Sequence, residues 1–108
     1  MLEKKVIEKV KKYFKTTFET CDFNKIHISP LHNRGFPDLV VITDQRTYFL
    51  EVKAPGKKPT ILQRAKLNEI KRCSGDSGTE AYWVTFKKGE GLVFFDPEKD
   101  EVMWTVKV

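Results

Sequence analysis

The chain has 108 residues, of which 40% are hydrophobic and 32% are charged, and this composition is typical of a single soluble globular domain spanning residues 1–108. No apolar run approaches the ~20 residues needed to cross a bilayer, and no secretory signal is visible, so we expect no membrane partner and a cytoplasmic location. The net charge of +5 favours a polyanionic partner. Cys21 and Cys73 lack metal-ligand spacing, which predicts free thiols.

The first predicted element is a helix from Leu2 to about Glu19, in which apolar residues recur at helical spacing. Glu3 lies near the centre of the apolar stripe, whereas Glu8 lies about 140° away among lysines on the solvent side. A carboxylate on a buried face needs a partner, so Glu3 is a candidate site residue. The alternative is an acid in the first helical turn, favoured by the helix dipole and hydrated at the frayed end.

A short strand is predicted at residues 25–29, and a loop follows from residue 30 to residue 37. Gly35 is expected to supply a turn conformation or a close approach to the backbone of a ligand. Arg34 beside it is a candidate phosphate contact, and a solvated surface arginine is the alternative. His27 and His32 lack partners at metal-ligand spacing.

Two apolar, largely β-branched segments at residues 38–43 and 47–53 are separated by polar residues, which predicts a β-hairpin. A two-residue turn would place Asp38 directly opposite Glu51, and a four-residue loop would place it opposite Lys53. Residues that oppose each other, and residues two apart on one strand, share a face of the sheet. Either turn therefore brings the three charged side chains together.

Opposed carboxylates repel each other unless a cation lies between them. A divalent metal bound by oxygen ligands resolves this conflict, so we expect Asp38 and Glu51 to bind Mg²⁺ or Mn²⁺, with the Val52 carbonyl as a further ligand. Such a metal suits phosphodiester hydrolysis, in which Lys53 would orient or activate the attacking water. The alternative is a structural cluster of ion pairs at the edge of a sheet.

The loop from residue 54 to residue 59 follows directly after the second hairpin strand. It carries Lys57 and Lys58, which are candidate contacts to the DNA backbone because they lie close to the end of that strand. The next helix is predicted to run from residue 60 to about residue 73.

Thr60 and Gln63 have the spacing of a capping box at the start of this helix. Gln63 also aligns with the inward stripe, where it would position a water molecule, so a capping role and a site role both remain open. Lys66 lies near the same stripe and either snorkels or faces the site. Arg64 is expected to point outward, as a DNA contact or a solvated residue.

Three further strands are predicted at residues 80–86, 92–95 and 102–106, and four aromatic residues on them are expected in the core: Trp83, Phe94, Phe95 and Trp104. The order α-β-β-β-α-β-β-β predicts an α/β fold with a central mixed β-sheet flanked by helices. Because the last strands leave a sheet edge to cover, part of the aromatic surface is a candidate dimer interface.

The combination of Pro37-Asp38 with Glu51-x-Lys53 resembles the PD-(D/E)xK nuclease superfamily. More narrowly, Gly35-x-Pro37-Asp38, then Glu51-Val52-Lys53-Ala54-Pro55-Gly56, then Gln63 is similar to the VRR-NUC domain, and the resemblance extends from Glu3 to about Phe86. It implies a restriction-endonuclease-like fold in which the aspartate and glutamate bind the metal and the lysine is catalytic. The helix glutamine and the N-terminal glutamate, here Gln63 and Glu3, would complete the site.

Small members of this family resemble phage or bacterial enzymes that act as dimers on branched DNA. The resemblance therefore implies a metal-dependent, structure-specific endonuclease of a bacterial or phage-infected cell, which resolves four-way (Holliday) junctions as a homodimer without an organic cofactor. The alternatives are a nuclease for flaps, nicks or plain duplex DNA, including a restriction-like role, and a nucleic-acid-binding module without catalysis.

Overall fold

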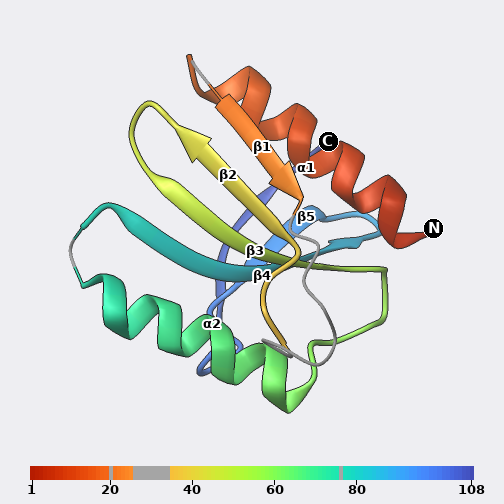
Figure 1. The fold of residues 1–108 in the computed structure, drawn as a ribbon. Coiled ribbons are helices and arrows are strands. Elements are labelled where there is room, and N and C mark those ends of the chain that lie inside the picture. The colour runs from red at the N-terminus through yellow and green to blue at the C-terminus, as the bar shows by residue number, and fades with distance from the viewer. Residues whose placement is uncertain (20, 26–34, 76) are drawn as a thin grey trace.

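The computed structural model describes residues 1–19, 21–25, 35–75 and 77–108. These residues form an α/β structure in which a mixed six-stranded sheet is flanked by two helices (Figure 1). The elements, in chain order, are α1 (Glu3–Thr17), β1 (Cys21–Lys25), β2 (Leu39–Thr43), β3 (Thr47–Lys53), α2 (Ile61–Ser74), β4 (Thr79–Lys87), β5 (Gly91–Phe95) and β6 (Val102–Val106). The predicted order of elements is confirmed.

The strands lie in the sheet in the same order as in the chain. Only the β3–β4 pair is parallel, and α2 forms the connection between these two strands; the other neighbours are antiparallel. The strand predicted at residues 25–29 was placed too late, because β1 begins at Cys21 and its Cys21 and Phe23 pack against the core beside α1. Residues 26–29 of that prediction lie outside the described residues.

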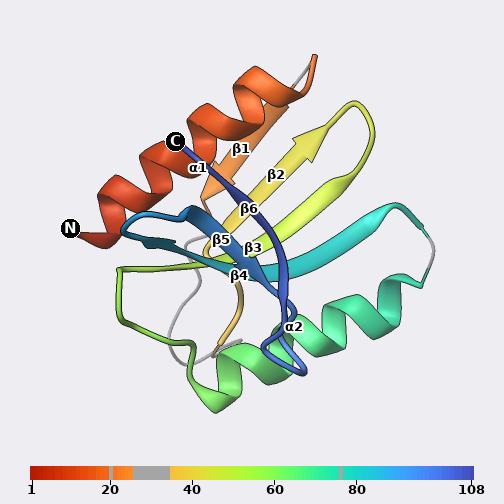
Figure 2. The same ribbon diagram turned by 180° about the vertical axis from the view of Figure 1, so that it is seen from behind.

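Helix α1 covers one face of the sheet, and α2 covers the other, as the two opposite views show (Figures 1 and 2). Val6, Val10 and Phe14 are fully buried against the strands, which confirms the predicted apolar stripe, although Thr17 at the end of the helix is exposed. Glu8 is exposed and pairs with Lys5 at 3.6 Å, as predicted for the solvent side.

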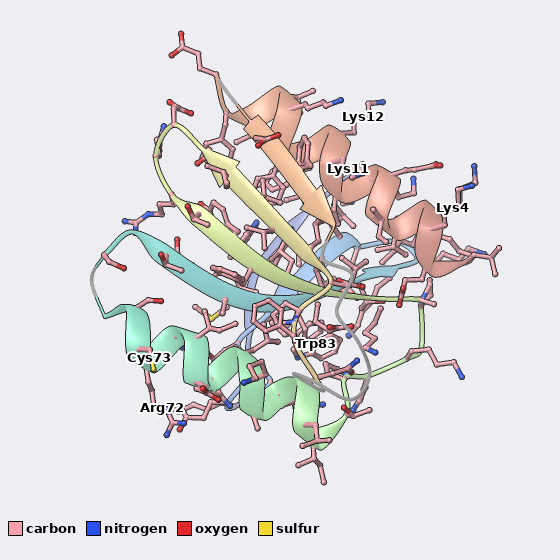
Figure 3. All side chains as sticks on the ribbon, in the orientation of Figure 1. Lys4, Lys11, Lys12, Arg72, Cys73 and Trp83 are labelled. Atoms are coloured by element: carbon pink, nitrogen blue, oxygen red, sulfur yellow. The ribbon has the colours of Figure 1, made fainter. Side chains whose placement is uncertain are left out.

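The face under α2 has its own smaller core. Leu67 packs there with Trp83 and Phe95, whose rings stack with centroids 4.0 Å apart, and Figure 3 shows Trp83 between the sheet and α2. Phe94 is buried on the opposite face and stacks on Trp104 of the edge strand β6. The core prediction is therefore confirmed for Trp83, Phe94 and Phe95, whereas Trp104 is only partly buried.

Gly35 has a φ of +80°, which confirms the predicted turn conformation. The close approach that it permits is to the protein itself, since a Cβ at this position would lie 2.6 Å from the backbone oxygen of Leu62. Glycine thus lets the loop before β2 pack directly on the first turn of α2. This contact brings together the two segments that carry Asp38 and Gln63.

Two further predictions concern the chain as a whole. Cys21 and Cys73 are free thiols, as expected. Among the described residues, neither helix has the length and apolar character required to span a membrane.

Candidate active site

The hairpin of β2 and β3 has the register of the two-residue turn. Leu39 pairs with Leu50, and the N–H of Thr43 donates to the carbonyl of Arg46 at 2.9 Å, so the four-residue alternative is wrong. Asp38 lies one residue before β2, where its Oδ1 accepts a hydrogen bond from the N–H of Val52 at 3.3 Å. The register therefore places the aspartate beside Glu51.

Glu51 is the centre of the site. It is a carboxylate on a central strand with only 4% of its surface exposed. The Nζ of Lys53 lies 3.5 Å from its Oε2, and the Nε2 of Gln63 donates to the same oxygen at 3.3 Å. Side chains from β3 and α2 thus converge beside Asp38, which is the convergence expected from the sequence.

Gln63 forms the capping box and also contacts the site, and the predicted role of positioning a water molecule stays a prediction. Its Oε1 accepts a hydrogen bond from the N–H of Thr60 at 2.9 Å, and its own N–H donates to the Thr60 hydroxyl at 3.1 Å, which completes the capping box. Its Nε2 remains available and reaches Glu51. The cap fixes the amide plane, so the donor group is held in place before any ligand binds.

The two carboxyl groups resist joint ionisation. Burial raises the pKa of Glu51 from 4.5 to about 8, and the charge of Asp38 adds to this rise while Lys53 opposes it. Burial likewise raises the pKa of Asp38 from 3.8 to about 6, against the effect of the hydrogen bond from Val52. Two neighbouring acids with raised pKa values form a place where a cation would be favourable.

Glu3 lies within electrostatic range of both acids, because its charge contributes to the raised pKa of Asp38 and of Glu51. It is half-buried in the first turn of α1. Within the described residues it makes no hydrogen bond or ion pair with the site. Its prediction as a site residue is thus supported in position, and a direct role stays a prediction.

The donor set suits a hard cation that keeps much of its water. No group of three or more His, Cys, Asp or Glu side chains with metal-site geometry occurs among the described residues, and within them Asp38 and Glu51 are the neighbouring carboxylates that could hold the ion. Mg²⁺ is commonly held by one or two carboxylates together with waters and substrate phosphates, and this pair fits that pattern. The backbone N–H of Val52 serves Asp38, and a role for its carbonyl stays a prediction.

The residues predicted to contact nucleic acid lie in different surroundings. Lys57 and Lys58 are exposed in the loop after β3, as expected. Arg64 does not point outward: its guanidinium lies 5.7 Å from the Trp83 ring centroid and forms an ion pair with Asp100. The prediction of an outward orientation is wrong because the turn between β5 and β6 folds back over α2.

The remaining predicted residues add little to the site. Lys66 pairs with the exposed Glu69 at 3.2 Å, so it snorkels toward solvent and does not reach Glu51. Arg34, His27 and His32 lie outside the residues that the structure describes.

Sequence reasoning missed Thr85. It is 3% exposed, and its Oγ1 donates to the backbone oxygen of Lys53 at 2.9 Å. Thr85 pairs with Lys53 across the parallel strands, and its hydroxyl holds the end of β3 in place. The signal that could have identified Thr85 is its spacing. Ala81, Trp83 and Thr85 are two positions apart, so they share one buried face of the strand, and Thr85 is the polar member of that row.

No protein-family model matches this chain, and none of the curated proteins matches it.

Proposed function

We propose that the chain is a DNA endonuclease that depends on Mg²⁺ or Mn²⁺ and has a restriction-endonuclease-like fold. The observation that carries the proposal is Glu51, a buried carboxylate that contacts Lys53 and Gln63 and lies beside Asp38. Burying neighbouring acids costs stability unless a cation or a function compensates for them. The mixed sheet with a helix on each face is compatible with that fold.

Each side chain has a distinct task in this proposal. Asp38 and Glu51 would hold the metal ion, which when bound acts as a Lewis acid that neutralises charge on the scissile phosphate. Lys53, only 15% exposed, would orient the attacking water and offset the charge that develops in the transition state. Gln63 would present its capped amide to the same water, and Thr85 keeps the backbone of Lys53 in position.

The substrate that we propose is branched DNA, with the four-way junction as the first choice and a homodimer as the active form. This step rests on the resemblance to the VRR-NUC domain. The homodimer is also supported by β6, an edge strand that exposes Val102 (54%) and Met103 (48%). An edge with exposed apolar residues is suited to an interface between two copies of the chain. Flaps, nicks and plain duplex are the alternative substrates.

The test is cleavage of end-labelled four-way junction, flap, nicked duplex, duplex and single strand in Mg²⁺ or Mn²⁺. Wild-type protein is compared with Lys53→Ala and Asp38→Asn, and Lys88→Ala is the control at an exposed residue of the turn after β4. We expect paired symmetrical nicks in the junction from wild type and the control, and none from the two site variants. Cleavage of other substrates alone would remove the junction assignment. A folded wild-type protein that binds DNA but cuts nothing would favour the binding module.

A further inference from the structure

A cavity of about 170 Å³ opens next to the candidate active site, between the loop that follows β3 and the strands β4 and β5. Thr85 forms part of its wall, and the Thr85 hydroxyl holds the backbone oxygen of Lys53. The cavity and the site therefore share a structural element. None of the functions proposed above uses this cavity.

The rings in the cavity wall lie in one row with the site. Across neighbouring strands, Glu51 pairs with Trp83, and Trp83 pairs with Phe95. Since neighbouring strands are about 5 Å apart, the backbone of Phe95 lies about 10 Å from that of Glu51. The stacked rings of Trp83 and Phe95 line the cavity within a nucleotide's reach of the acids. They are only 3% and 6% exposed, so a base can reach the Phe95 ring only when the Lys87 side chain above it moves away.

The cations of the cavity have no carboxylate partner. Lys57, Lys58 and Lys87 line it, and no ion pair involves them among the residues that the structure describes. The ammonium of Lys87 lies 5.2 Å from the Phe95 ring centroid, and its side chain is exposed, so it can move when a ligand enters. This combination favours a ligand that is both anionic and aromatic.

The acid in the cavity wall does not cancel this charge. The carboxylate of Asp100 forms an ion pair with Arg64, and its Oδ1 also accepts a hydrogen bond from the Trp83 indole N–H at 3.0 Å. On the neighbouring surface of α2, Lys66 and Lys71 are likewise paired with acids. Among the residues that the structure describes, the cavity thus gathers three lysines close to the site whose charge no acid offsets.

We propose that the cavity receives one unpaired nucleotide of the substrate strand beside the phosphodiester bond that is cut. Its base would lie against the ring of Phe95 in place of the Lys87 ammonium, and Lys57, Lys58 and Lys87 would contact its phosphate. A paired base stays stacked between its neighbours and cannot reach the cavity. The inference rests on the proposed nuclease function, and it narrows the substrate class to DNA with an unpaired nucleotide next to the cleaved bond, as at a flap or at a four-way junction whose central base pairs have opened.

The test measures binding, not cleavage. All proteins carry Lys53→Ala and are assayed in Mg²⁺ with two duplexes that differ only in whether a single 2-aminopurine is paired or unpaired. Binding is followed by anisotropy, and entry of the base is followed by the quenching of 2-aminopurine when it stacks. Lys87→Ala is compared with Lys88→Ala, which removes the same charge from an exposed position outside the cavity, and Phe95→Leu removes the ring while keeping an apolar side chain.

We expect the starting protein to bind the unpaired probe more tightly than the paired one and to quench it more strongly. Phe95→Leu should lose about tenfold in affinity for the unpaired probe alone, which is the size usual for one stacked base. Lys87→Ala should lower the preference for the unpaired over the paired probe, and Lys88→Ala should leave that preference unchanged. If both lysine variants weaken both probes equally, or if the starting protein binds both probes alike, the cavity assignment is overturned. The lysine pair decides the matter if Phe95→Leu fails to fold.

The cleavage assay described above separates the two proposals. Cleavage without a preference for the unpaired probe would leave the nuclease and remove the cavity assignment. A preference in a protein that cuts no DNA would keep the cavity and remove the nuclease.

Discussion

Replacing Glu51 with glutamine should stabilise the metal-free protein at alkaline pH, although it removes the central residue of the site. The carboxyl group has a folded-state pKa raised from 4.5 to about 8 by burial and by Asp38. Its proton is therefore bound more tightly in the folded state. The resulting stabilisation is complete below pH 4.5 and is lost as the pH rises through about 8.

The size of the effect follows from the same values. The rise from 4.5 to about 8 corresponds to a ceiling of about 5 kcal/mol, at about 1.4 kcal/mol per pKa unit. Glutamine avoids the buried charge and keeps an acceptor for Gln63, but its new N–H₂ group lacks a partner, at a cost of about 1–3 kcal/mol. Above pH 8 we expect Glu51→Gln to be about 2–4 kcal/mol more stable than wild type, and at pH 5 the order should reverse.

The assay is urea unfolding in EDTA between pH 5 and pH 9, with Glu90→Gln as a control at an exposed position in the turn between β4 and β5. The control should follow wild type within about 0.5 kcal/mol. Parallel stability curves for wild type and Glu51→Gln would refute the reasoning. At pH 8, Mg²⁺ at about 100 times its dissociation constant should raise the free energy of unfolding of wild type by about 2.7 kcal/mol, and that of Glu51→Gln by much less. This comparison tests metal binding without a measurement of activity.

Five other substitutions test the supports of the site and their surroundings. Gly35→Ala should lower the free energy of unfolding by about 3 kcal/mol, because the residue has a φ of +80° and its new Cβ would also clash with the backbone of α2. Gly56→Ala is the matched control: its φ is +83° but its surroundings are open, so it should cost about 1 kcal/mol. Thr60→Ala should cost about 1 kcal/mol and leave cleavage intact, whereas Gln63→Ala should also slow cleavage about 100-fold. Arg64→Ala should cost about 1–2 kcal/mol and, because it leaves the Asp100 carboxylate in the cavity wall without its cation, should also weaken DNA binding as measured by anisotropy.

The hairpin was predictable from the sequence because its geometry is local. The length of the turn decides which residue opposes Asp38, and the period of two decides that Glu51 and Lys53 share a face. Only one choice, between two turn lengths, had to be made by the structure. The capping box at Thr60 was predictable for the same reason, since its two residues are three positions apart.

The errors concern residues whose surroundings come from distant parts of the chain. Arg64 lies on the side of α2 that is polar by sequence, and its inward contact exists only because Asp100 is brought there from 36 positions away. Asn68 and Lys71 make contacts to the same turn, at Pro97 and Asp96. Helical periodicity does not report where another loop will fold, so Arg64 was predicted to point outward.

A comparison inside the molecule bears on the alternative of a structural ion-pair cluster. Asp96 exposes about as little of its surface as Glu51, at 5% against 4%, and burial acts to raise the pKa of both carboxyl groups, less strongly for Asp96. For Asp96, however, hydrogen bonds from Lys71 and from the N–H of Lys99 outweigh burial, and its pKa is lowered.

Glu51 also has a lysine, 3.5 Å away, yet its pKa rises, first because of burial and then because Asp38 and, to a smaller extent, Glu3 add negative charge around it. A structural ion pair has the first arrangement, in which the partners satisfy the charge. An excess of acid around a buried carboxylate leaves negative charge that the chain itself does not neutralise, and this is the arrangement that a divalent cation would complete.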